Sequence, residues 1–295
     1  MIITSNFGEL LYPGLKAIWG EYPAKPMVYE QVFRVENSTQ AYEKTLGMTG
    51  FGMAVTKTEG GAISYDDAYQ GLTQTLTHVT KGLGFQVTRE MAEDDQYGKI
   101  RRLPEALRWS INQTIEYDAA SVLINCTSTS YLGADGKALL ATDHTQMDGN
   151  SYKNKLSTDA DISMTSLEQA YIDIGDITND RSLLINLRPR KLVISTEQEW
   201  TVKQLLKSAQ DPESNYNAIN PAQGSIDYVV WPFLTDADAW FILTDAPQGL
   251  VYYWRRRPDF TKDNDFETEN AKFKSTYRSI YGWDDPRGIF GSTGA

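Results

Sequence analysis

A long amphipathic helix limits the choice of folds more than any other pattern in this sequence. Apolar residues recur at helical spacing between Pro104 and Asn125, and proline is well tolerated in the first turn of a helix. At 1.5 Å per residue, such a helix would extend about 30 Å. The preceding residues allow an extra turn or two, interrupted at Gly98. We therefore predict one long helix that starts near Pro104.

Two shorter helices with a strand between them are predicted in the second half of the chain. The first helix spans 167–175 and follows a Thr-x-x-Glu capping box that begins at Thr165. The strand spans 192–194, and a second capping box, which begins at Thr196, starts the next helix. That helix carries Trp200, Leu205, Leu206 and Ala209.

The last third of the chain predicts strands separated by Pro, Gly and Asp. The expected strands cover 228–232, 240–244, 250–254 and 273–283. Residues 127–161 are polar and predict a hairpin that turns at Asp135-Gly136, followed by a long loop. The predicted fold class is α+β, and no fixed-period repeat or low-complexity linker divides the chain.

The first ninety residues predict extended segments rather than a core of their own. Pro13, Pro23 and Pro26 interrupt an apolar N-terminal segment, which predicts an arm on the surface of its own or a neighbouring subunit. The alternative is an N-terminal helix packed on its own domain. Extended stretches at 50–58 and 82–88 flank a polar middle, which predicts a long hairpin or projecting loop.

The formal net charge of -11 argues against a broad nucleic-acid-binding surface, because neutralising phosphates requires clustered Lys and Arg. It is compatible with a container wall that encloses DNA without gripping it. No apolar stretch approaches the roughly 20 residues of a membrane span, and the N-terminus lacks a basic region followed by an apolar one. The single cysteine, Cys126, is expected to be buried, in a chain made in a reducing cytoplasm.

Motifs for catalysis, metal binding and cofactor binding are missing from the sequence. His78 and His144 have no second His or Cys at metal-ligand spacing, and Asp143 is interpreted as a turn residue beside a surface histidine. The acidic run 263–267 lacks the glycine and glutamate of a calcium loop. Arg255–Arg257 is interpreted as a solvated strand end or ion-pair partner rather than a nucleic-acid contact. We therefore predict no enzyme activity, no cofactor and no metal.

Four short sequence motifs in the middle of the chain occur in the order found in a known family. They are LLATDH at 139–144, NKLS at 154–157, SLEQA at 166–170 and LRPRKLVI at 187–194. In this order they resemble the landmarks of tailed-bacteriophage major capsid proteins of the Mu-like head-subunit type, which have the Hong Kong 97-like fold. The resemblance covers residues 137–210, about a quarter of the chain.

The resemblance implies a division of the chain into four parts. An N-terminal arm is expected at 1–48 and an extended E-loop at 54–90. A P-domain with the long spine helix is expected at 91–159 and 251–295, and an A-domain at 160–250.

The resemblance also implies a function. The chain is expected to be a major capsid protein that self-assembles, through hexamers and pentamers, into the icosahedral shell of a virion. The shell would enclose double-stranded DNA without sequence-specific binding. Other expected partners are a portal and a separate scaffolding protein, because no scaffolding segment precedes the arm. Assembly is expected in the host bacterial cytoplasm, without a membrane.

Two other functions are alternatives to the capsid subunit. One is another phage structural part, a tail or decoration protein. The other is a hydrolase with a scattered active site, which would need convergent polar residues in a pocket. The long helix followed by helix, strand and helix favours the capsid subunit, because tail tubes are expected to be more purely β.

Apolar residues of the arm and the loop are predicted to make the contacts between subunits. They are Phe7, Leu11, Tyr12 and Trp19 in the arm, and Tyr65, Tyr69 and Leu72 in the loop. Burial of apolar area contributes roughly 25 cal/mol per Å², less the cost of ordering flexible segments. Many weak contacts would then stabilise a closed shell through their number.

Overall fold

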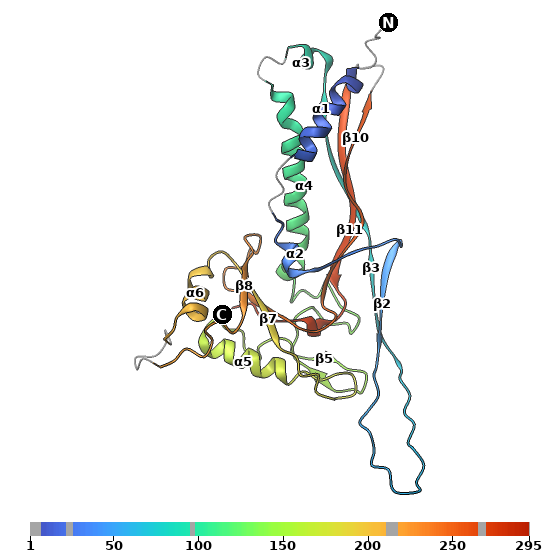
Figure 1. The fold of residues 1–295 in the computed structure, drawn as a ribbon, viewed down its shortest axis with the longest axis vertical. Coiled ribbons are helices and arrows are strands. Elements are labelled where there is room, and N and C mark those ends of the chain that lie inside the picture. Colours follow the sequence, from blue (N-terminus) through green and yellow to red (C-terminus); the bar gives the residue numbers. More distant parts are fainter. Residues whose placement is uncertain (1–6, 22–25, 95–97, 211–217, 265–269, 295) are drawn as a thin grey trace.

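The computed structural model describes residues 7–21, 26–94, 98–210, 218–264 and 270–294. The molecule has an elongated lobe, a compact lobe at one end of it, and a hairpin that projects beyond the compact lobe (Figure 1). Helices and strands are mixed in both lobes, so the fold is α+β as predicted.

The long lobe is built on a four-stranded sheet of order β1-β10-β11-β4. The strands are β1 (Arg34–Asn37), β4 (Val79–Val87), β10 (Leu250–Asn264) and β11 (Ala271–Trp283). The predicted strand at 250–254 is therefore only the beginning of β10. The β10–β11 pairing shifts register twice between Trp254 and Asp259, and such irregularities let a ladder accommodate a proline, which has no N–H to donate.

The predicted long helix is α4 (Lys99–Ile124), which lies along one face of this sheet (Figure 1). It starts at Lys99 rather than near Pro104, directly after Gly98. Gly98 has φ 62°, a left-handed conformation that glycine adopts without steric cost. The apolar residues buried along α4 are Ile100, Leu107, Ile111, Ile115, Ala119, Val122 and Leu123.

Three further helices pack in the long lobe: α1 (Phe7–Glu21), α2 (Tyr29–Val32) and α3 (Arg89–Glu93). In α1, the rings of Tyr12 and Trp19 stack on Phe260 of β10, with centroid distances of 6.0 and 5.4 Å. The described part of the N-terminal segment is thus a helix packed on its own domain, which was the alternative to an arm.

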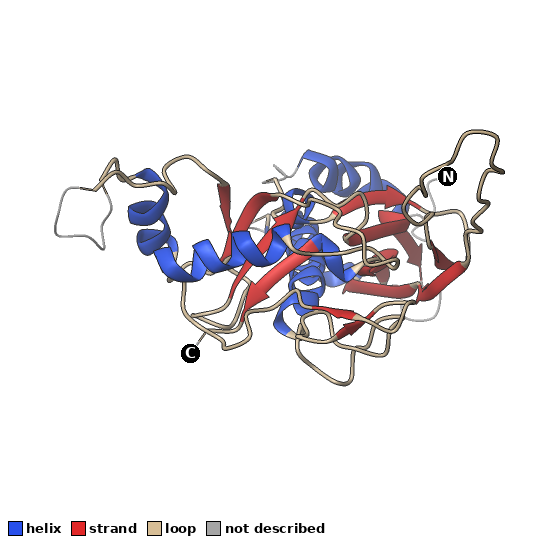
Figure 2. Ribbon diagram, turned by 90° about the horizontal axis from the view of Figure 1, so that it is seen from below, coloured by secondary structure: helices blue, strands red, loops and turns tan. Residues whose placement is uncertain are grey.

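The compact lobe contains a second four-stranded sheet, of order β12-β9-β7-β8. The strands are β7 (Pro189–Ile194), β8 (Asp227–Val230), β9 (Trp240–Thr244) and β12 (Ile289–Ser292). The helices α5 (Met164–Gly175) and α6 (Glu199–Lys207) belong to the same lobe, on the side of the molecule away from the hairpin (Figure 2). Because β12 pairs with β9, the end of the range expected for the P-domain lies in the compact lobe's sheet.

Both predicted capping boxes are wrong, although the helices themselves are present. The N-cap of α5 is Ser163, whose side chain accepts from the backbone of the third helical residue, so Thr165 lies inside the helix. The helix expected from Thr196 has Gln198 as its N-cap, without a capping hydrogen bond. Trp200 points outward and is 74% exposed. The buried face of α6 consists of Val202, Leu205 and Leu206.

The projecting hairpin is formed by β2 (Tyr42–Met48) and β3 (Gln70–Thr77), which pair antiparallel. The expected extended stretches at 50–58 and 82–88 do not form this hairpin. Residues of β4 pair with β11 instead, and Gly84 allows the close approach, because a Cβ there would lie 2.6 Å from the Phe273 carbonyl oxygen.

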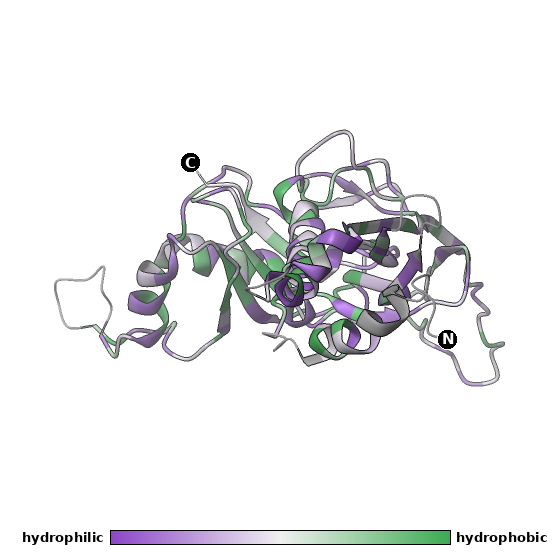
Figure 3. Ribbon diagram, turned by 90° about the horizontal axis from the view of Figure 1, so that it is seen from above, coloured by the Kyte–Doolittle hydropathy of each residue, from purple (hydrophilic) through white to green (hydrophobic). Residues whose placement is uncertain are grey.

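A short hairpin and a turn connect the two lobes. The strands β5 (His144–Thr145) and β6 (Ser151–Tyr152) pair antiparallel. The predicted turn at Asp135-Gly136 is present, with a 2.7 Å hydrogen bond from the Gly133 N–H to the Lys137 carbonyl, but no strands flank it. Hydrophobic residues form two buried clusters, whereas the projecting loop mixes hydrophilic and hydrophobic stretches (Figure 3).

Candidate assembly surface

The β2–β3 hairpin has paired strands at its base and an unpaired loop beyond them. The ladder shifts register around Gly47 and ends at the pair Met48 and Gln70. Gly47 lies against Gly71, and a Cβ on Gly71 would lie 3.0 Å from the Gly47 carbonyl carbon. Residues 49–69 continue as a loop without strand pairing (Figure 1). The two glycines therefore mark the boundary between a paired base and an unpaired distal loop.

The distal loop exposes large apolar side chains to solvent. Tyr65 is 92% exposed and Met53 is 79% exposed. The other exposed large apolar residues of this loop are Phe51, Val55, Ile63 and Tyr69. Clustered exposure of this kind marks interaction surfaces in soluble proteins. The loop is therefore the best candidate in the described structure for a surface that another molecule covers.

Sequence reasoning pointed to two residues of this loop, Tyr65 and Tyr69, and to Leu72 in β3, and their contacts with a neighbour stay a prediction. Tyr65, Tyr69 and Leu72 were predicted contacts, and all three are exposed in the isolated chain. It missed Phe51, Met53, Val55 and Ile63. Their signal was the alternation of apolar residues at 51, 53 and 55 in an extended stretch.

The predicted contacts in the N-terminal segment have a different placement. Trp19 is 7% exposed and belongs to the core of its own lobe, so it offers little surface to a neighbour. Tyr12 is partly buried, and its hydroxyl donates to the Phe260 carbonyl oxygen at 3.1 Å. The side chains of Phe7 and Leu11 lie outside the described residues.

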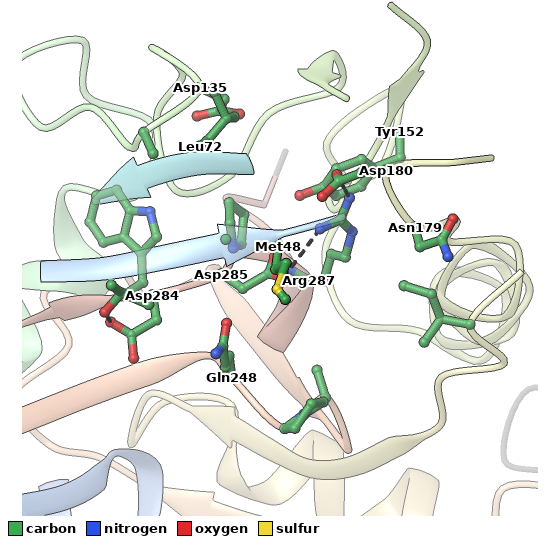
Figure 4. Close-up of a pocket in the computed structure, with 18 of the residues that line it drawn as sticks. Met48, Leu72, Asp135, Tyr152, Asn179, Asp180, Gln248, Asp284, Asp285 and Arg287 are labelled. Carbon is green, nitrogen blue, oxygen red and sulfur yellow. Dashed lines mark hydrogen bonds and ion pairs between the residues drawn. The ribbon is translucent and has the colours of Figure 1, made fainter. Parts of the chain in front are cut away.

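A cavity of about 260 Å³ lies where the base of the hairpin meets both lobes (Figure 4). Met48 and Leu72 line it from the hairpin. Asp284 holds the hairpin base on the long lobe, because its carboxylate accepts from the Thr45 hydroxyl at 2.8 Å and from the Arg34 guanidinium at 2.9 Å. Burial raises the pKa of Asp284. The cavity therefore lies beneath a hairpin that is tied down at its base.

The polar groups on the other side of the cavity pair with one another. Arg287 donates to Asp180 at 2.7 Å and to Asp285 at 3.2 Å, and its guanidinium lies 4.5 Å from the Tyr152 ring centroid (Figure 4). It also donates to the Thr178 carbonyl oxygen at 3.1 Å. With its charge compensated by two carboxylates, Arg287 fastens the segment after β11 to the compact lobe.

His144 is fully buried, so its prediction as a surface residue is wrong. Its Nδ1 lies 2.6 Å from the Asp135 carboxylate, and its Nε2 lies 3.0 Å from Oδ1 of Asn154. Burial opposes ionisation of Asp135, but the hydrogen bond and charge of His144 outweigh it and hold the Asp135 pKa below its usual range. The neighbouring Asp143 pairs with Lys137 instead. These contacts form a structural network without a nucleophile.

The remaining candidates for chemistry also have structural partners. Arg256 donates to the Thr276 hydroxyl at 2.7 Å, and the Arg257 guanidinium lies 5.6 Å from the Trp254 ring centroid. Cys126 is buried, as predicted, and burial raises its thiol pKa to about 12. Within the described ranges, no group of three His, Cys, Asp or Glu side chains could hold a metal ion. The acidic run 263–267 lies largely outside them.

No helix among the described residues is both long enough and apolar enough to cross a membrane.

Comparison with protein families gives a match to a family described as phage capsid protein. The family model matches residues 71–291, from β3 of the hairpin to β12 of the compact lobe. Comparison with curated protein sequences finds no match.

Several solved structures have a similar fold. The capsid of bacteriophage JBD30 has a TM-score of 0.60 and 15% identity, covering 72% of this chain and 92% of that chain. The capsid of a native GTA particle has a TM-score of 0.57 and 13% identity, covering 94% and 97%. The procapsid of bacteriophage JBD30 has a TM-score of 0.52 and 17% identity, covering 97% and 75%. At these identities the likeness concerns the fold.

Proposed function

The chain belongs to the phage capsid protein family and is a major capsid protein, and from this premise we propose that its hairpin builds the shell by reaching a neighbouring copy. The observation that carries the proposal is the exposed apolar surface of the distal loop, where Tyr65 is 92% exposed. Exposed apolar surface does not stabilise a monomer in water, whereas in a shell each subunit can bury this surface against a neighbour. Each contact would be weak, and multiplicity would stabilise the closed shell.

The four-part division remains part of this proposal, with ends adjusted to the observed strands. The long lobe corresponds to the P-domain, with α4 as its spine, and the compact lobe to the A-domain. The E-loop corresponds to the hairpin at 42–77, rather than to 54–90. The N-terminal arm would end before β2, with α1 held on its own lobe. The two lobes would provide rigid surfaces for hexamers and pentamers.

The remaining partners follow from the same premise. A separate scaffolding protein and a portal are proposed to take part in assembly in the host bacterial cytoplasm, and the shell is proposed to enclose double-stranded DNA. The net charge of -11 supports a wall that lets packaged DNA move past without strong attraction. We also propose that the protein has no catalytic activity. The buried His144 network supports this, because a carboxylate and an amide occupy both ring nitrogens.

Charge placed on the hairpin tests the proposal. We expect Tyr65→Asp to reduce the yield of closed shells strongly, as seen by electron microscopy and sedimentation velocity, because it puts a charge into an apolar contact. Thr56→Asp is the matched control, since Thr56 is exposed in the same loop. Monomer stability should be unchanged in both variants. Equal shell yields for the two variants would contradict the role of the hairpin.

A further inference from the structure

Arg181 of the compact lobe contacts the distal loop of the hairpin in its own subunit. In the part of the chain that the structure describes, the polar and ring contacts between loop and lobe all come from Arg181. Its guanidinium donates to the Asp67 carbonyl oxygen at 2.6 Å and lies 3.6 Å from the Asp66 carboxylate. It also lies 5.2 Å from the Tyr69 ring centroid. One arginine therefore contacts three residues within a stretch of four near the end of the loop.

The turn that presents Arg181 is held by hydrogen bonds within the compact lobe. Oδ1 of Asn179 accepts hydrogen bonds from the backbone N–H groups of Arg181 and Leu183, both at 2.9 Å. Ser182 has φ 56°, a left-handed conformation that is uncommon for residues other than glycine. A bridge between Thr178 and Leu184 closes the turn. The position of Arg181 is thus set by the compact lobe and does not depend on the loop.

The loop itself has the means to move away from this contact. The strand ladder is irregular at Gly47, which faces Gly71. Beyond these glycines, Met48 pairs with Gln70, and Thr49 and Tyr69 are joined by hydrogen bonds. Two facing glycines leave the backbone free to bend. The cavity of about 260 Å³ beneath Met48 and Leu72 leaves space between hairpin and body on one side of this boundary. Arg181, which is held in place by the compact lobe, therefore contacts a loop that can bend at its base.

We propose that Arg181 is a clasp that holds the distal loop on its own subunit before assembly and releases it to a neighbouring copy. This inference rests on the proposed role of the hairpin in building the shell. The clasp covers one face of Tyr69, a residue predicted to contact the neighbour, so the two uses of that ring exclude each other. Exposed ion pairs and cation–π contacts are individually weak, which lets the larger apolar contact with a neighbour displace them. The clasp thereby restrains the apolar loop in free subunits without blocking the shell.

Hydrogen exchange on the unassembled full-length protein tests the clasp directly. Arg181→Ala should speed exchange of the hydrogen-bonded amides of the loop, those of Thr49, Gly52 and Tyr69, by about three- to tenfold, while exchange in α4 stays unchanged. Arg181→Lys should give a smaller increase, because it keeps the charge but loses the planar group that lies over the ring. Arg188→Ala is the matched control, since Arg188 is exposed on the same lobe. Equal exchange in Arg181→Ala and Arg188→Ala would overturn the clasp.

Assembly kinetics test the release step separately. Light scattering should show a shorter lag for Arg181→Ala than for wild type at low salt, and the difference should shrink at high salt, where the ion pair is screened. Faster exchange with an unchanged lag would overturn the gating role. If wild type and all variants fail to form shells together with the candidate scaffold, the proposed function fails, whereas the exchange result still decides whether the clasp exists.

Discussion

The Glu116 carboxylate accepts a hydrogen bond from the Trp231 indole N–H at 2.9 Å, which joins the long helix to the compact lobe. Its other oxygen accepts from the backbone N–H of Val28 at 2.6 Å, at the start of α2. Glu116 is 6% exposed. A single buried carboxylate therefore joins the N-terminal segment, the spine helix and the strand end after β8.

Replacing this carboxylate by an amide should destabilise the subunit. Glu116→Gln puts an NH₂ donor opposite one of two N–H donors, which leaves a buried donor without an acceptor. We expect a loss of about 1–3 kcal/mol at neutral pH, measured by urea unfolding. Glu105→Gln, on an exposed position of the same helix, should change stability little. Equal unfolding midpoints for the two variants would contradict the bridging role.

The buried pair of Asp135 and His144 predicts a dependence of stability on pH. The Asp135 pKa is lower in the folded than in the unfolded chain, so its contribution is present above the ordinary Asp pKa, about 3.9, and is lost as pH falls through the folded value. The stability difference between wild type and Asp135→Asn should thus be largest near neutrality and shrink below about pH 4. A difference that does not vary between pH 3 and pH 7 would argue against an ionised Asp135.

The buried thiol of Cys126 should be nearly inert in the folded subunit. A thiol pKa of about 12 leaves about a thousandth or less of the thiolate present at the ordinary value of about 8.5. A thiol reagent at pH 7.5 should therefore modify the native protein over a thousandfold more slowly than the urea-unfolded protein. The unfolded protein is also the control, because it should titrate as one thiol per chain. Rapid native labelling would show that the site opens.

The two facing glycines of the hairpin should not tolerate a methyl group. In Gly71→Ala the new Cβ would lie 3.0 Å from the Gly47 backbone, so the two backbones must move apart by a few tenths of an ångström. We expect faster hydrogen exchange in 42–48 and 70–77, with an unchanged unfolding midpoint for the two lobes. Gly50→Ala is the control, because a Cβ there meets nothing within 4 Å. If the hairpin amides exchange as slowly in Gly71→Ala as in wild type, the strands accommodate the methyl group, which would contradict the prediction.

Local patterns predicted much of the fold, because they carry their own signal. The long helix and the strand at 240–244 were predicted from apolar periodicity, and both are present. Strand partners were not predictable in the same way. The pairing of 82–87 with β11 joins residues almost two hundred positions apart, and no local pattern specifies it. Trp19 illustrates the same limit, because only the tertiary structure shows that Phe260 covers it.

The candidate surface was predicted in part for a related reason. Aromatic residues at Tyr65 and Tyr69 stand out in a polar segment, whereas Met53 and Val55 resemble ordinary strand residues until the absence of a partner strand is seen. Arg181 had no sequence signal, since its contacts with the loop cross more than a hundred positions. The paired base and the unpaired tip of the hairpin became distinct only with the observed register.

The pairing of β12 with β9 determines when a newly synthesised chain can complete its fold. Forty-four residues, including all of β10 and β11, separate Thr244 from Ile289. At roughly 5–20 residues per second, a ribosome needs about two to nine seconds to synthesise that interval. During this time the compact lobe lacks an edge strand, and the ribbon of the long lobe is unfinished. The two sheets are therefore completed almost together, because β11 and β12, which complete the pairing of the long lobe and of the compact lobe, follow each other in the chain.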